Sequence, residues 1–133
     1  MNLSLRSAAM IAWLLAGAFL TIKLVALWLN DGSDEGLAGV MFVAGFLSLV
    51  VAAVLSGVMI GRRRGGLLSA VGAVVMLILV VVMHSVIDGI LKSIFTVSGW
   101  KQDEMGILAD AVIALGIAGA MFMRRPAQVS SDA

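Results

Sequence analysis

The chain has 133 residues, of which 62% are apolar and 13% are charged, and its net charge is +1. A soluble domain has roughly 45–50% apolar and about 25% charged residues, so this chain has too few polar side chains to cover its apolar ones in water and is expected in a bilayer. The small net charge argues against binding of nucleic acid, and the absence of cysteine excludes disulfides, thiolate metal sites and cysteine nucleophiles.

The first apolar run covers residues 8–29 and contains one charge, Lys23, near its end. It is about twice as long as the hydrophobic core of a signal peptide, which has roughly 7–15 residues. At about 1.5 Å per residue, the run covers the hydrocarbon core of a bilayer, which is roughly 30 Å thick. We therefore expect a retained transmembrane helix.

The second apolar run, residues 37–60, contains no charge and follows a short polar loop, NDGSDEG, that is rich in turn-forming residues. Its small residues Ala53, Gly57 and Gly61 recur at every fourth position. This spacing allows another helix to approach closely. We expect the stripe to pack inside the protein, and a dimer seam is the alternative.

The third apolar run, residues 67–97, is the longest, and we expect the rest of the chain to be organised around it. It follows the sequence GRRRGG, in which the arginines stay out of the bilayer and the glycines allow a tight reversal. His84, Asp88 and Lys92 are spaced four residues apart and would form one column on a helix. A run of this length must tilt, or project its far end toward the membrane interface.

The fourth apolar run, residues 105–123, is followed by Arg124 and Arg125. Residues 1–126 are therefore expected to form one transmembrane domain, and residues 127–133 a disordered cytoplasmic tail. The four runs predict an all-α, polytopic membrane protein, built as an antiparallel bundle of four transmembrane helices with short loops.

Basic residues are distributed unevenly between the two sides of this predicted bundle. One side carries six arginines, whereas the opposite loops carry only Lys101. The excess of basic residues on cytoplasmic loops places both termini in the cytoplasm, in a bacterial-type plasma (inner) membrane. The expected topology anchors are Arg62, Arg63, Arg64, Arg124 and Arg125, together with Arg6.

The predicted topology places several ionisable side chains at a similar depth below the outer surface. Lys23 lies near the outer end of the first span and Asp110 near the outer start of the fourth, both roughly 8–9 Å below the boundary. His84 and Asp88 reach the same layer from the third span. Lys92 is a peripheral member, because its long side chain can extend to the headgroups.

Each of these polar positions shares a helix face with small side chains, which are typical of contacts between membrane helices. We therefore expect the polar layer to point into the bundle, where Lys23, His84, Asp88 and Asp110 converge. A homo-oligomer or another membrane protein could also use such faces. The small residues are Ala9, Ala12 and Ala16 beside Lys23, Gly106, Ala114 and Ala118 beside Asp110, and Ala73, Ala70 and Gly66 beside His84.

Two interpretations of this layer remain open. In the structural one, Asp88 pairs with Lys92 within its helix, Lys23 pairs with Asp110 across helices, and these pairs fix the register of the bundle. In the other, the aspartates and His84 relay protons in a small proton-coupled transporter or ion channel. The spans contain no helix-breaking proline, and their inner half has only serine hydroxyls, which favours the structural interpretation.

No motif in the sequence indicates an enzyme, a metal site or a cofactor, since there is no metal-ligand cluster and no phosphate-binding glycine loop. We expect a non-enzymatic structural or accessory component of a membrane assembly, in contact with the lipid bilayer and with a membrane-protein partner or a second copy. Trp13, Trp28 and Trp100 are expected to anchor at the interfaces, and Trp28 and Trp100 could also rim a shallow outer pocket.

The order of these features is similar to that in DoxX-like four-helix membrane proteins. The points of similarity are Lys23 and Leu24 late in the first span, the arginine turn after the second span, and a histidine late in the third. Such features are common in small membrane proteins. We therefore carry no function or site residue across from the resemblance and assign no family.

Overall fold

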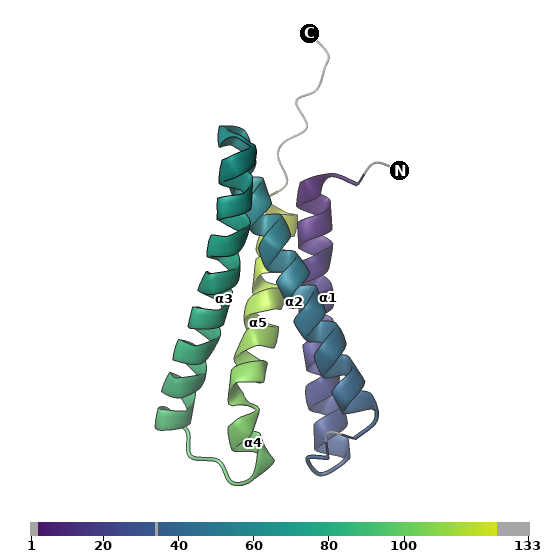
Figure 1. The fold of residues 1–133 in the computed structure, drawn as a ribbon. Helices are drawn as coiled ribbons and strands as arrows, with labels where there is room; N and C mark the ends of the chain where they lie inside the picture. The colour runs from purple at the N-terminus through teal and green to yellow at the C-terminus, as the bar shows by residue number, and fades with distance from the viewer. Residues whose placement is uncertain (1–2, 34, 125–133) are drawn as a thin grey trace.

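The protein is a bundle of helices in the computed structural model, which describes residues 3–33 and 35–124. In chain order the elements are α1 (Leu5–Leu29), α2 (Leu37–Gly61), the 3₁₀ turn η1 (Arg62–Arg64), α3 (Gly66–Ile94), the short α4 (Trp100–Asp103) and α5 (Met105–Met123). Four helices, α1, α2, α3 and α5, are long and apolar enough to cross a membrane. They alternate in direction (Figure 1), so the chain is a multi-pass membrane protein with the predicted antiparallel four-helix architecture.

The four long helices form a closed ring. α1 packs against α2 and α5, and α3 packs against α2 and α5 on the other side. The helices lie close together at the end that carries η1, which we call the arginine end, and α3 diverges from α1 and α2 toward the opposite end, which we call the α4 end (Figure 1). The helix axes therefore lie closer together at the arginine end than at the α4 end.

The most deeply packed helix is α1, and the expectation that residues 67–97 organise the fold is wrong. Ala9, Ala16 and Leu20 of α1 are at most 2% exposed, whereas no residue of α3 is buried. The reason is the size of the side chains. One face of α1 is lined with small residues that admit α2 and α5, while α3 carries leucine, valine and isoleucine around its whole circumference and suits contact with lipid.

The third membrane helix ends three residues earlier than residues 67–97 predict, because the backbone of Phe95 is extended, with φ −105° and ψ 113°. The amide side chain of Gln102 holds the segment that follows. It accepts a hydrogen bond from the Val97 N–H (2.9 Å) and donates one to the Lys92 carbonyl (3.2 Å). The loop is thus tied back to the last turn of α3.

The first membrane helix begins earlier than predicted, because the Ser4 hydroxyl accepts a hydrogen bond of 3.1 Å from the Ser7 N–H and caps α1. This extension places Arg6 inside the helix. Its guanidinium donates to the carbonyl oxygens of Met121 (2.7 Å) and Arg124 (2.6 Å), at the end of α5, where carbonyls lack partners within the helix. Arg6 therefore caps α5.

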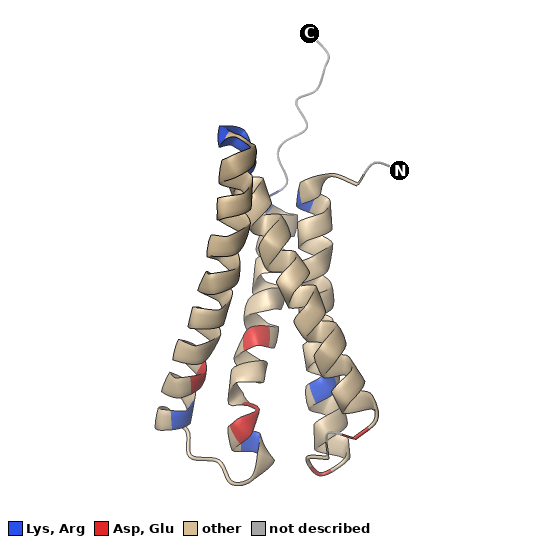
Figure 2. Ribbon diagram, in the orientation of Figure 1, with Lys and Arg blue, Asp and Glu red and all other residues tan. Residues whose placement is uncertain are grey.

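The arginines gather at one end of the bundle. Figure 2 shows them on η1 and at the start of α1, whereas the acidic residues lie in the other half. Arg124 follows α5 at the same end as Arg6. The predicted anchor Arg125 and the predicted tail, residues 127–133, lie outside the described residues.

The backbones of α2 and α3 approach each other closely where these helices cross at the arginine end. A Cβ atom added to Gly57 would lie 2.2 Å from the Gly72 carbonyl oxygen, and one added to Gly61 would lie 2.1 Å from the Leu68 carbonyl oxygen. Gly57 and Gly61 are buried, and Ala53 is fully buried. The predicted packing of this stripe inside the protein is therefore confirmed.

Trp13 lies in the core, so the expectation that it anchors at a membrane interface is wrong. Its side chain is 3% exposed, and its indole N–H donates a hydrogen bond of 2.9 Å to the Ser56 hydroxyl. The small neighbours of Trp13 on α1 bring α2 close enough for this bond to form. It links α1 and α2 within the buried layer.

Removal of the Ser56 hydroxyl is expected to destabilise the bundle. Ser56→Ala leaves the buried indole N–H of Trp13 without its acceptor, which costs about 1–3 kcal/mol. The control is Ser85→Ala, since the exposed Ser85 hydroxyl bonds only to the Val81 carbonyl of its own helix. Thermal unfolding in detergent, followed by circular dichroism, should show a loss for Ser56→Ala alone, and equal effects of the two variants would contradict the expectation.

Candidate functional site

The described residues form three ion pairs, all in the half of the bundle nearer α4. They are Lys23–Glu104, His84–Asp110 and Lys92–Asp88. The structure brings His84, Asp88 and Asp110 together along the contact between α3 and α5, whereas Lys23 lies on the other side of α5, facing it from α1. The four residues predicted to converge are thus divided between two sides of α5.

Lys23 forms an ion pair with Glu104, so the pairing of Lys23 with Asp110 that the structural interpretation predicted is wrong. The distance between Lys23 Nζ and Glu104 Oε2 is 2.7 Å, and the side chains are 5% and 15% exposed. The ammonium also lies 4.5 Å from the centroid of the Phe42 ring, within range of a cation–π contact. This pair connects α1 to the start of α5, beside an aromatic ring of α2.

Helix geometry explains why the two carboxylates near the start of α5 have different partners. Glu104 is the N-cap residue of α5, with φ −93° and ψ 3°, and Asp110 follows six residues later, which at about 100° per residue is about 120° round the helix axis. Asp110 faces α3, and Glu104 faces α1. The signal for Glu104 in the sequence is its position directly before the apolar run, because the long side chain of Lys23 can carry its ammonium outward to that level.

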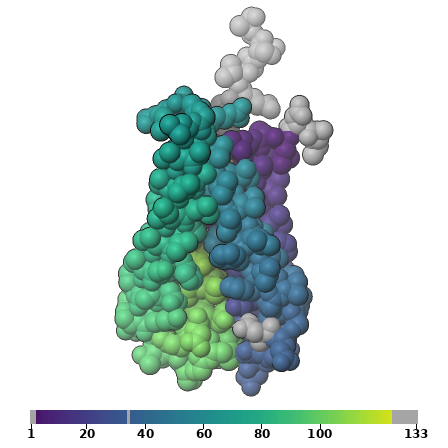
Figure 3. All heavy atoms as spheres, in the orientation of Figure 1, coloured from purple at the N-terminus to yellow at the C-terminus, as the bar shows by residue number. Residues whose placement is uncertain are grey.

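His84 and Asp110 form a pair between α3 and α5. The distance between His84 Nδ1 and Asp110 Oδ2 is 2.6 Å, and the His84 side chain is 39% exposed. Two cavities, of about 220 and 190 Å³, both border this pair. The larger lies among α2, α3 and α5 and is also lined by Phe42 and Phe46. In the view of Figure 3, part of α5 is visible between α2 and α3.

Asp88 and Lys92 pair within α3, as their spacing predicted, with 2.8 Å between Lys92 Nζ and Asp88 Oδ2. The Asp88 side chain also lies against Gly106 of α5, where an added Cβ would be 2.5 Å from Asp88 Oδ1. A small residue at position 106 therefore lets α5 accept this carboxylate.

The small-residue faces that were predicted on α1, α3 and α5 differ in how far they are buried. The faces beside Lys23 and Asp110 are buried, as expected. The face beside His84 is not, because α3 meets α2 through Gly72 and the half-buried Ala73, while Gly66 and Ala70 are exposed. The buried residues are Ala9, Ala12, Ala16, Gly106, Ala114 and Ala118, and the residues that are not buried are Gly66, Ala70 and Ala73.

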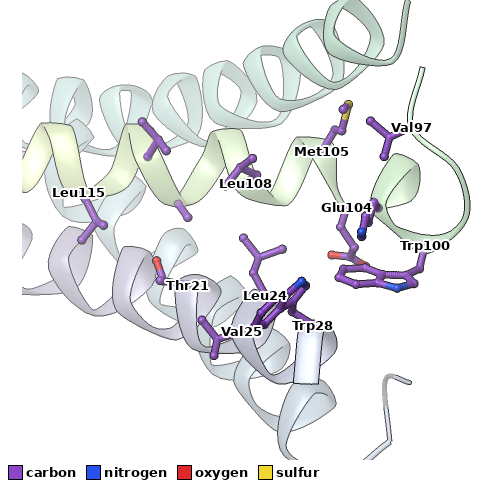
Figure 4. A pocket seen from close by; sticks show the side chains of 13 residues that line it. Thr21, Leu24, Val25, Trp28, Val97, Trp100, Glu104, Met105, Leu108 and Leu115 are labelled. Carbon is purple, nitrogen blue, oxygen red and sulfur yellow. The ribbon is translucent and has the colours of Figure 1, made fainter. Parts of the chain in front are cut away.

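A groove of about 700 Å³ lies between α1 and α5 at the α4 end (Figure 4). Trp28 and Trp100 both line it, in agreement with the expectation that they could rim a pocket there. The indole of Trp100 packs on the backbone of Gly32, whose φ is +87° and whose added Cβ would lie 2.2 Å from the ring. The rest of the lining is mainly apolar and consists of Thr21, Leu24, Val25, Val97, Lys101, Glu104, Met105, Leu108, Ala111, Val112 and Leu115.

Within residues 3–33 and 35–124, no three His, Asp or Glu side chains are grouped in a way that could hold a metal ion. Comparisons with protein-family models, with curated proteins and with solved structures gave no significant match to this chain. The resemblance to DoxX-like membrane proteins therefore has no support beyond the features on which it was based.

Proposed function

We propose that this protein is a non-enzymatic structural or accessory component of a membrane assembly. The observation that carries this proposal is that the ionisable side chains of its spans are paired within the chain. Lys23–Glu104 joins α1 to α5, and His84–Asp110 joins α3 to α5. α5 is the shortest of the four membrane helices, and the two pairs hold it from both sides.

The cost of burying charges supports this role for the pairs. A charged side chain at the centre of a bilayer costs about 2.5–3.5 kcal/mol on insertion scales and more in other estimates. An oppositely charged partner lowers this cost, so charged residues in membrane helices are usually paired. In the Lys23–Glu104 and His84–Asp110 pairs the partners come from different helices, so these two pairs also fix the position of one helix against another.

The arginine end of the bundle offers little to a transported ion. The backbones of α2 and α3 are in contact there at Gly57 and Gly72. The hydroxyls of Ser48 and Ser69 bond to carbonyls of their own helices, at 2.8 and 3.3 Å, and Ser56 accepts from Trp13. These serines are thus already hydrogen-bonded, which supports a role without conduction.

The surface left for partners is lateral. The small-residue faces of α1 and α5 are buried inside the bundle, so a membrane-protein partner or a second copy would meet the exposed apolar faces of the four membrane helices. We place the protein in the plasma membrane, with both termini in the cytoplasm. The gathering of Arg6, Arg62–Arg64 and Arg124 at one end supports this orientation.

A proton-coupled transporter or ion channel is the second candidate, and the surroundings of the His84–Asp110 pair favour it. Both cavities beside the pair have room for several water molecules, whose share of the liquid is about 30 Å³ each. When Nδ1 of His84 is engaged with the carboxylate, Nε2 is the nitrogen that remains to exchange a proton. The pair would then be the proton-binding element.

Proton flux into liposomes distinguishes the two candidates. We expect liposomes containing the purified protein to acidify no faster than protein-free liposomes under an imposed pH gradient, measured with an internal pH-sensitive dye. His84→Asn and Asp110→Asn should leave that rate unchanged. A rate well above background, lost in well-folded His84→Asn protein, would overturn the structural proposal in favour of transport.

A further inference from the structure

We propose that the groove between α1 and α5 binds one phospholipid molecule from the leaflet at the α4 end, with an acyl chain in the groove and the phosphate beside Lys101. This inference goes beyond the proposed function. It depends only on the protein being in a bilayer, and it holds whether or not the ion pairs move protons.

The length of the groove matches one leaflet. Along α5 its lining runs from Met105 to Leu115, which at about 1.5 Å per residue is about 15 Å. That is half of the hydrocarbon core, which is roughly 30 Å thick. A transmembrane helix of a partner would span the whole core, whereas an acyl chain reaches only to its middle. The groove therefore fits a lipid chain better than a helix.

The groove is polar and aromatic at one end and aliphatic at the other, as a phospholipid is polar at its headgroup and aliphatic along its acyl chains. Figure 4 shows Trp28 and Trp100 at one end and Leu115 at the other. Tryptophans favour the headgroup level, where the ring can be apolar on one side and hydrogen-bonded on the other. Lys101, at the same end, is exposed and offers a cation to a phosphate. The deeper lining is aliphatic.

Two features make the polar end of the groove suitable for an anion. Glu104 lines the groove, but its carboxylate lies 2.7 Å from the Lys23 ammonium, which offsets its negative charge. Trp100 is fixed in place against Gly32. The volume of about 700 Å³ lies within the range of about 300–1,000 Å³ that is typical of small-molecule sites.

Filling the groove should displace the lipid. The test is native mass spectrometry of the full chain, purified in detergent and incubated with phosphatidylglycerol. Leu108→Trp combined with Val112→Trp fills the groove from two side chains that are 54% and 63% exposed. The matched control is Val43→Trp with Leu47→Trp on α2, at 56% and 57% exposure, outside the groove and also four residues apart.

We expect the wild-type and control proteins to retain one phosphatidylglycerol per chain, and the groove variant to bind it roughly tenfold more weakly, which corresponds to about 1.4 kcal/mol. Lys101→Ala should weaken binding about fivefold, as expected for one cation near a phosphate, and Lys101→Arg should restore it. Three results would overturn the proposal: no lipid on the wild-type protein, equal retention in the groove and control variants, or a dimer that only the groove variant dissociates, which would assign the groove to a second copy.

Discussion

Lys23→Met is expected to lower the free energy of unfolding by about 3–5 kcal/mol. The substitution removes the ammonium 2.7 Å from the Glu104 carboxylate, whose side chain is 15% exposed. A carboxylate that loses its cation at such a site keeps the full cost of its desolvation. The measurement is unfolding in mixed micelles of increasing denaturing detergent.

A double substitution separates the loss of the pair from the exposure of a single charge. Lys23→Met combined with Glu104→Met removes both charges and should recover most of the lost stability. Lys92→Met is the matched control, because its pair with Asp88 lies within one helix and is more exposed, so its loss should leave the unfolding curve almost unchanged. A double variant no more stable than Lys23→Met would show that packing, and not charge, is the source of the effect.

Gly57→Val is expected to cost about 3 kcal/mol, because it forces α2 and α3 apart at their crossing. The Cβ atom would lie 2.2 Å from the Gly72 carbonyl oxygen, and this neighbour is backbone that cannot rotate away. The backbones must separate, and the neighbouring contact of Gly61 with Leu68 would be disturbed as well. Thermal unfolding in detergent, followed by circular dichroism, measures the loss.

The control for this substitution is Gly116→Val on α5, where an added Cβ meets nothing within 4 Å. Both positions are glycines inside membrane helices, so the change in helix propensity is the same for the two variants. The difference between them reports the helix crossing alone. Equal stability of the two variants would contradict the close contact between α2 and α3.

The sequence by itself determined the four membrane helices and the end at which the arginines gather. Both are local properties. A helix that crosses a bilayer needs only about 20 consecutive apolar residues, and loops are marked by charges and turn-forming residues next to one another in the chain. The same reasoning found the pairing of Asp88 with Lys92, because residues four apart on one helix are neighbours whatever surrounds them.

Only the tertiary structure decided which helix is the most deeply packed, which carboxylate Lys23 binds, and where the groove opens. These features depend on the rotation of each helix about its own axis, and a shift of one residue in a contact turns a side chain by about 100°. Small residues on α1 and the crossing at Gly57 set those rotations, since they determine how closely each pair of backbones can approach. That rotation is a property of two packed helices together, and so it cannot be read from either helix alone.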